Sequence, residues 1–185
     1  LVGSEMCIRD RWCQEEGLDL DKITPSKFDS VLGEGTGAGM IFGNTGGVME
    51  AALRTVYRVL EGKEAPADFY QLRPVRGLSN RKEAEVTIAG KKLRVCILYG
   101  TAAAEEFLAE DMNGYHFVEV MTCPGGCISG AGQPDCGSVP VSDVVRKKRI
   151  QSLYQADEQA ERRNSMDNPE IGTIYHEFFK EPLSM

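Results

Sequence analysis

The chain has 185 residues, 42% hydrophobic and 26% charged, with a formal net charge of -7 and a pI near 5.0. This composition is ordinary for one globular domain and excludes disorder and membrane embedding, because no apolar run approaches the roughly 20 residues that cross a bilayer. The acidic balance argues against nucleic acid as a partner, and the one basic cluster, residues 146–149, is expected to be a solvated helix face. Residues 1–11 lack the basic and apolar segments of a secretory signal, so we expect a cytoplasmic protein.

The first third of the chain predicts two helices separated by a loop. A short helix is expected within residues 12–20, ending near Gly17. Residues 24–45 are interpreted as a long loop, because Pro25 and five glycines would each weaken a regular element. Apolar residues recur at helical spacing over residues 48–60, with Thr45 available as the N-cap and Gly62 as the stop.

The middle and last thirds predict strands followed by helices. Residues 83–88 and 93–99 flank the tight turn Ala89-Gly90 and are typical of a β-hairpin. An alanine-rich helix over 101–110 and a strand over 115–121 follow, and this order favours an α/β fold with a mixed sheet flanked by helices. The C-terminal segment from about residue 141 is expected to be helical over 141–163 and 169–179, with Pro169 in the first turn of the second helix.

Residues 119–134 combine two cysteines, Cys123 and Cys127, with a glycine-rich loop that directly follows the last predicted strand. Two thiols four positions apart on such a loop can converge on one metal centre, because glycine allows backbone amides to approach closely. A structural zinc loop, two unrelated buried thiols and a redox-active pair remain open from spacing alone. The other cysteines and histidines offer no second ligand pair: Cys96 is expected to be buried in a strand, Cys136 could contribute, and His116 and His176 are isolated.

The loop resembles the third signature of the iron-only (FeFe) hydrogenases, Glu-x-Met-x-Cys-x-x-Gly-Cys-x-x-Gly-Gly-Gly-Gln-Pro. Every fixed position matches except one, where Ala131 replaces the middle glycine. Residues 37–54 are similar to a second loop and helix of that family. The resemblance extends from about Trp12 to the end and implies the C-terminal half of a two-lobed hydrogenase catalytic domain.

In that family the active site is a 4Fe-4S cluster bridged by a cysteine sulfur to a diiron unit (the H-cluster), and it reversibly reduces protons to hydrogen. The resemblance implies that Cys123 ligates the 4Fe-4S cluster, that Cys127 ligates it and bridges to the diiron unit, and that Met121 and Phe42 line the diiron pocket. It also implies that ferredoxin or an iron-sulfur domain exchanges the electrons. The two earlier cysteine signatures are missing from this chain, so we expect a fragment that is inactive alone.

Three alternatives remain beside the hydrogenase hypothesis, and it carries two further expectations, one for the N-terminal residues and one for an exposed face. The chain could belong to a hydrogen-sensing member of the family, to a hydrogenase-like iron-sulfur assembly factor, or to a zinc-stabilised α/β domain. Residues 1–11, including Cys7, resemble a translated sequencing adapter, which leaves 12–185 as the hydrogenase lobe. The face that should meet the missing half is expected to include Phe42, Met121 and the cysteine loop, with apolar surface exposed there.

Overall fold

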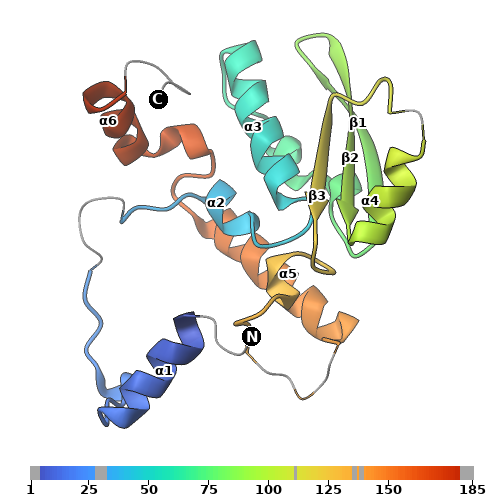
Figure 1. The fold of residues 1–185 in the computed structure, drawn as a ribbon. Helices are drawn as coiled ribbons and strands as arrows, with labels where there is room; N and C mark the ends of the chain where they lie inside the picture. Colours follow the sequence, from blue (N-terminus) through green and yellow to red (C-terminus); the bar gives the residue numbers. More distant parts are fainter. Residues whose placement is uncertain (1–4, 28–32, 111, 135–136, 138–139, 180–185) are drawn as a thin grey trace.

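The computed structural model describes residues 5–27, 33–110, 112–134, 137 and 140–179 (Figure 1). The α-helices are α1 (Glu5–Glu15), α2 (Gly37–Ile41), α3 (Gly47–Glu61), α4 (Thr101–Leu108), α5 (Asp143–Gln159) and α6 (Pro169–Glu177). The strands are β1 (Arg81–Ile88), β2 (Lys91–Tyr99) and β3 (Phe117–Met121). Short 3-10 helices are η1 (Leu20–Lys22), η2 (Ala67–Gln71), η3 (Arg73–Val75), η4 (Cys127–Ser129) and η5 (Ser165–Asp167).

The three strands of the described residues form one mixed sheet in the order β1-β2-β3. β1 and β2 are an antiparallel hairpin in which Ile88 pairs with Lys91. The connecting residues Ala89 and Gly90 both have positive φ, 49° and 73°, as a tight hairpin turn requires. β3 pairs with β2 in parallel after the α4 crossover, with Cys96 opposite Val118. The predicted hairpin and the α/β class with a mixed sheet are confirmed.

Helices cover both faces of the sheet because the central strand is apolar on both sides. Val95 and Ile97 of β2 point to a core shared with α3, whereas Cys96 and Leu98 point to a second core shared with Phe107 of α4. Alternating side chains of a strand point to opposite faces, so four successive buried residues require a layer on each side. Cys96 is fully buried among apolar side chains, as the sequence predicts.

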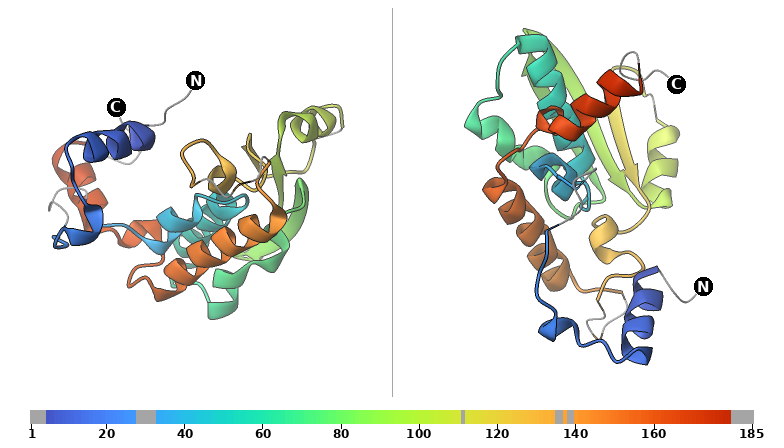
Figure 2. Two further views of the ribbon diagram at one scale, coloured as in Figure 1. Left: turned by 90° about the horizontal axis from the view of Figure 1, so that it is seen from below. Right: turned by 90° about the vertical axis from the view of Figure 1, so that its left-hand side faces the viewer.

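After the cysteine loop, α5 packs against α2 and runs below α2 and α3, whereas α6 lies above α2 (Figure 1). α5 begins at the N-cap Ser142, whose side chain accepts from the N–H of Val145, and α6 has Pro169 in its first turn with Asn168 as the N-cap. Figure 2 shows α5 running across α2 and α3, with α1 standing away from this body. The helical C-terminal segment is therefore confirmed, although α5 ends at Gln159.

The sequence predictions for the start of the first helix, for the loop over residues 24–45 and for the start of the third strand are wrong. The first helix runs over Glu5–Glu15 instead of starting near Trp12, so it crosses the predicted boundary after residue 11; the division into 1–11 and 12–185 stays a prediction. The expected loop over 24–45 contains α2, which Thr36 caps by accepting from the N–H of Gly39 at 3.2 Å. Residues 115 and 116 precede β3, which begins at Phe117.

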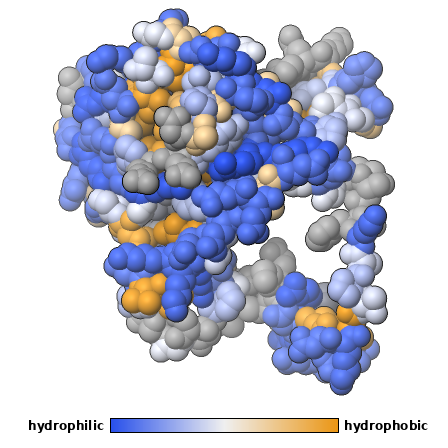
Figure 3. Space-filling view, turned by 180° about the vertical axis from the view of Figure 1, so that it is seen from behind, coloured by the Kyte–Doolittle hydropathy of each residue, from blue (hydrophilic) through white to orange (hydrophobic). Residues whose placement is uncertain are grey.

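No helix among the described residues is long and apolar enough to cross a membrane. Seen from behind, the surface is mostly hydrophilic, with hydrophobic residues gathered in a few areas of the main body and of the N-terminal part (Figure 3). Exposed large hydrophobic residues include Phe42, Phe117 and Val120, which lie on α2's end and on β3.

Candidate metal centre in the cysteine loop

The cysteine loop, defined here as residues 122–134, leaves the end of β3 and is held by its own backbone hydrogen bonds. The N–H of Gly126 donates to the carbonyl of Cys123 at 2.9 Å, and the N–H of Gly130 donates to the carbonyl of Cys127 at 3.0 Å. Each cysteine therefore opens a tight turn. Gly125 and Gly126 have φ of 83° and 98°, a region that residues with a side chain rarely adopt.

The loop packs directly on the backbone of residues 43–45, which follow α2. The N–H of Thr45 donates to the carbonyl of Gly125 at 3.0 Å, and the N–H of Ile128 donates to the carbonyl of Gly43 at 3.1 Å. A Cβ atom at Gly126 would lie 2.7 to 2.8 Å from backbone atoms of residues 43–45. The two stretches that resembled hydrogenase signatures in the sequence are therefore in direct contact, and glycine is required where they touch.

Glu119 fastens β3, and thereby the start of the loop, to the N-terminus of α3. Its carboxylate is buried and accepts from the N–H groups of Gly46 at 2.6 Å and of Met49 at 2.7 Å. These N–H groups have no partner within the helix, and a negative charge is favourable at a helix N-terminus. The prediction that Thr45 caps this helix is wrong: Gly46 is the N-cap, and a carboxylate from β3 replaces a local cap.

Lys82 is the second buried charge beneath the loop. Its Nζ donates to the carbonyls of Thr45 and Gly77, both at 3.1 Å. Burial lowers the pKa of Lys82 to about 8, although the charge of Glu119 acts to raise it. Burial likewise raises the pKa of Glu119, against the two N–H groups and Lys82. The sequence predicts neither role, because the contacts of Glu119 with residues 46 and 49 and of Lys82 with Thr45 join parts that are remote along the chain.

The basic cluster at residues 146–149 is only half solvated, contrary to the sequence prediction. Lys147 and Lys148 are exposed, but Arg146 and Arg149 are partly buried and turn to the cysteine loop. Arg149 donates to the carbonyls of Ile128 and Pro134, each at 2.7 Å, and Arg146 donates to Ser129 Oγ at 3.3 Å. Residues three apart share a face of a helix, which separates the two arginines from the lysines.

The structure brings the predicted site segments together around Cys123 and Cys127. Cys123 is partly buried, Cys127 is exposed, and both are free thiols. Met121 is half-buried at the end of β3, and Phe42, next to the contacting Gly43, is 44% exposed. Cys136 lies outside the described residues. No group of three or more Cys, His, Asp or Glu able to hold a metal occurs in the described part of the chain, so the loop offers a pair of ligands.

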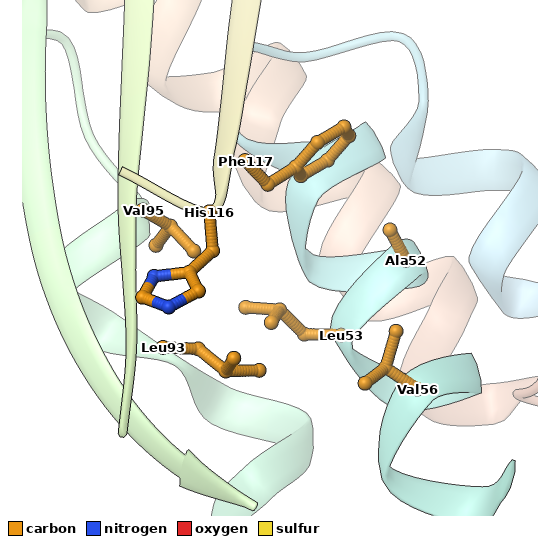
Figure 4. A pocket seen from close by; sticks show the side chains of 7 residues that line it. All are labelled: Ala52, Leu53, Val56, Leu93, Val95, His116 and Phe117. Atoms are coloured by element: carbon orange, nitrogen blue, oxygen red, sulfur yellow. The ribbon is translucent and has the colours of Figure 1, made fainter. Parts of the chain in front are cut away.

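One cavity adjoins Cys127, and a second lies away from the thiols. A cavity of about 290 Å³ is lined by Gly43, Cys127, Ile128, Gln133, Arg149, Ser152 and Leu153. An apolar pocket of about 330 Å³ lies at the opposite end of β3, between α3 and the sheet (Figure 4). There the Nδ1 atom of His116 accepts from the N–H of Arg94 at 3.1 Å, so this histidine has the structural role expected from the sequence.

A mixed sheet delivers two free thiols on a glycine-rich loop that buried charges hold in place, so the fold and the site define a protein with a pair of candidate metal ligands. Soft thiolate ligands favour zinc, copper or iron-sulfur clusters. The comparisons with known proteins narrow this class. Residues 9–131 match the model of the iron only hydrogenase large subunit, C-terminal domain, and residues 143–185 match that of the iron hydrogenase small subunit.

The chain belongs to the iron-only hydrogenase family. It is 39% identical over 165 residues to iron hydrogenase 1 of Clostridium pasteurianum, covering 87% of this chain and 28% of that protein. A variant of the FeFe-hydrogenase HydA1 from Chlamydomonas reinhardtii has a similar structure, with a TM-score of 0.68 and 30% identity over 95% of this chain and 50% of that one. The cytosolic Fe-S cluster assembly factor narfl of Xenopus tropicalis is more distant, at 27% identity over 92% of this chain and 36% of that protein. The chain thus spans about a quarter to a half of the length of these relatives.

Proposed function

We propose that this chain is the C-terminal lobe of the catalytic domain of an FeFe hydrogenase, whose full-length parent reversibly reduces protons to hydrogen. The observation that carries the proposal is the pair of free thiols, Cys123 and Cys127, on a loop that matches the family signature at every fixed position but one. Two backbone hydrogen bonds pack that loop against residues 43–45 of the second matching stretch, residues 37–54. Family membership makes the hydrogenase interpretation stronger than a zinc loop.

The donor set fits the 4Fe-4S part of an H-cluster. Thiolates are the usual ligands of such clusters, which take four of them. The described residues supply two, so the remaining two would come from the N-terminal part of the catalytic domain, and this chain alone would be inactive. The cluster, when bound, supplies the electron transfer and the metal chemistry of hydrogen.

We assign four residues to this site. Cys123 would ligate the 4Fe-4S cluster, and Cys127 would ligate it and bridge to the diiron unit. Met121 and Phe42 would line the pocket of the diiron unit and keep water from it. The exposed position of Phe42 fits a surface that a second lobe covers.

The partners and location follow from the same proposal. Ferredoxin or an attached iron-sulfur domain would exchange electrons with the cluster, and protons and hydrogen would be the substrates. Free thiols at all four described cysteines are compatible with a reducing compartment, so we propose the cytoplasm.

A chimera tests the proposal directly. Residues 12–185 would replace the matching segment of iron hydrogenase 1 from Clostridium pasteurianum, and the protein would be produced with its maturation machinery. We expect infrared bands of bound carbon monoxide and cyanide, and hydrogen evolution with reduced ferredoxin. A Cys127→Ser chimera is the control and should lose both. A folded chimera with neither bands nor iron would refute the proposal.

An iron-sulfur assembly factor is the second candidate, since such proteins are also related to this chain. It predicts that the chimera binds iron without carbonyl or cyanide bands. A hydrogen sensor predicts the bands with little turnover. Stoichiometric zinc without iron would favour the zinc-stabilised domain instead.

A further inference from the structure

α5 holds the C-terminal limb of the cysteine loop, residues 128–134, through two arginines. Arg146 donates to Ser129 Oγ at 3.3 Å, and Arg149 makes the shorter contacts. The guanidinium of Arg149 donates from Nη1 to the carbonyl of Ile128 and from Nη2 to the carbonyl of Pro134, each at 2.7 Å. The two carbonyls flank the stretch that contains Gly130, Ala131 and Gly132. The guanidinium of Arg149 therefore holds both ends of this stretch.

This limb has few other contacts to fix it. Within it, the N–H of Gln133 donates to the carbonyl of Gly130 at 3.3 Å, and the N–H of Gly130 donates to Cys127. Glycine costs more conformational entropy to order than any other residue, so a glycine-rich limb needs an external anchor. A charged donor to a carbonyl is stronger than a neutral one, and the rigid fork of arginine can serve two acceptors at once.

The limb also contacts one of the two thiols. A Cβ atom at Gly130 would lie 3.7 Å from Cys123 Sγ, so Gly130 is a direct neighbour of this partly buried thiol. Gly43 and Thr45 hold the loop at Ile128 and Gly125, before this stretch of glycines. Arg149 is thus the side chain that ties both Ile128 and the end of the loop at Pro134 to α5, and it lines the cavity that adjoins Cys127.

We infer that Arg149 is a positioning residue for the metal centre, which holds the loop so that Cys123 and Cys127 keep their relative placement before any metal binds. The inference rests on the proposed function only for the identity of the metal group that the two thiols would ligate. It also joins the two segments that match different family models, since Arg149 lies within 143–185 and its acceptors lie in or just after 9–131.

Thiol labelling of the metal-free 185-residue chain tests the inference. Each cysteine is labelled with iodoacetamide, and fragment-ion mass spectrometry assigns the rates. The variants are Arg149→Met, Arg149→Lys and the control Lys148→Met, an exposed neighbour on the same helix. In the wild-type chain the partly buried Cys123 should react more slowly than the exposed Cys127.

We expect Arg149→Met to raise the Cys123 rate about tenfold, the effect of losing a charge-assisted hydrogen bond on a local opening equilibrium. Arg149→Lys should restore part of the protection, because one ammonium can still reach a carbonyl, and Lys148→Met should change nothing. Cys96, fully buried in β2, reports global unfolding in the same sample and should stay unreactive.

An unchanged Cys123 rate in Arg149→Met would overturn the inference. So would a parallel rise at Cys96, because Arg149 would then support the whole fold rather than the loop. A Lys variant as reactive as the Met variant would show that the paired hydrogen bonds are irrelevant and would also overturn it. No iron is present in this experiment, so its outcome is independent of the chimera experiment that tests the hydrogenase proposal.

Discussion

A fully buried ion cluster joins α3 to α5, and its disruption should destabilise the chain more than any surface change. Arg54 of α3 makes two hydrogen bonds to the carboxylate of Asp157 in α5, both at 2.8 Å, and a third to Glu50 one turn earlier, also at 2.8 Å. All three side chains are fully buried. Burial alone would raise the pKa of Asp157, but the hydrogen bonds from Arg54 and Arg163 lower it overall, so the pair is ionised at neutral pH.

Replacing Arg54 with Met leaves two buried carboxylates without their shared cation. Removing one partner of a buried ion pair costs about 3–5 kcal/mol. Glu50 keeps its contact with Arg76 at 2.7 Å, and Asp157 keeps its contact with Arg163, so we expect the lower end, about 3 kcal/mol. A surface pair costs far less, about 0–1 kcal/mol.

Urea unfolding at pH 7, followed by far-ultraviolet circular dichroism, measures this difference. The matched control is Arg58→Met, one turn further along α3, where the arginine is one-third exposed and pairs with Glu64 and Asp167. Arg54→Met should lower the free energy of unfolding by about 3 kcal/mol and Arg58→Met by under about 1 kcal/mol. Equal losses in the two variants would refute the claim that the buried cluster stabilises the contact between the helices.

Three further predictions concern the groups beneath the cysteine loop. The pKa of Lys82 is 10.5 in the unfolded chain and about 8 in the folded one, so the unfolded chain binds more protons between these two pH values. The free energy of unfolding of the wild type, relative to that of Lys82→Met, should therefore rise by up to about 3 kcal/mol from pH 8 to 10.5. Urea unfolding measures this difference, and a value that does not change with pH would contradict the prediction. Gly126→Ala should cost several kcal/mol more than Gly114→Ala, because both have φ near 90° but only Gly126 has backbone within 3 Å of the new Cβ; similar losses in thermal unfolding would argue against the close packing. Glu119→Gln should cost about 1–3 kcal/mol by leaving one N–H of α3 without an acceptor, and faster hydrogen exchange at Met49 would locate that loss.

The elements that the sequence predicts well are those whose signals are local. The hairpin needs only alternating strands and a turn at Ala89-Gly90 with two positive φ values, and α3 needs only its apolar stripe and Gly62. α2 was missed because its glycines were interpreted as loop formers. In the structure Gly37 is glycine because a Cβ there would lie 2.1 Å from Asp157, a residue of α5 that is far along the chain.

The candidate site likewise has a part that the sequence predicts and a part that it does not. The cysteine pair and its glycines were found from the motif, since they are contiguous in sequence. The anchors were not: Glu119 caps a helix whose first residues lie 70 and 73 positions away, and Arg149 reaches back 15 and 21 positions to its carbonyls. Such contacts exist only once the chain has folded, and residue type alone does not distinguish these charges from solvated ones.

In α5 the helical repeat does separate the charges that contact the protein from those that face solvent. Arg149, Leu153 and Asp157 succeed one another at spacings of four, so they share one face. One end of this face holds the cysteine loop and the other holds Arg54 of α3. At 1.5 Å per residue the two contacts are about 12 Å apart on a single helix. α5 therefore connects the cysteine loop to α3. The charge run at residues 146–149, which composition assigns to solvent, is on one face part of the framework of the candidate metal centre.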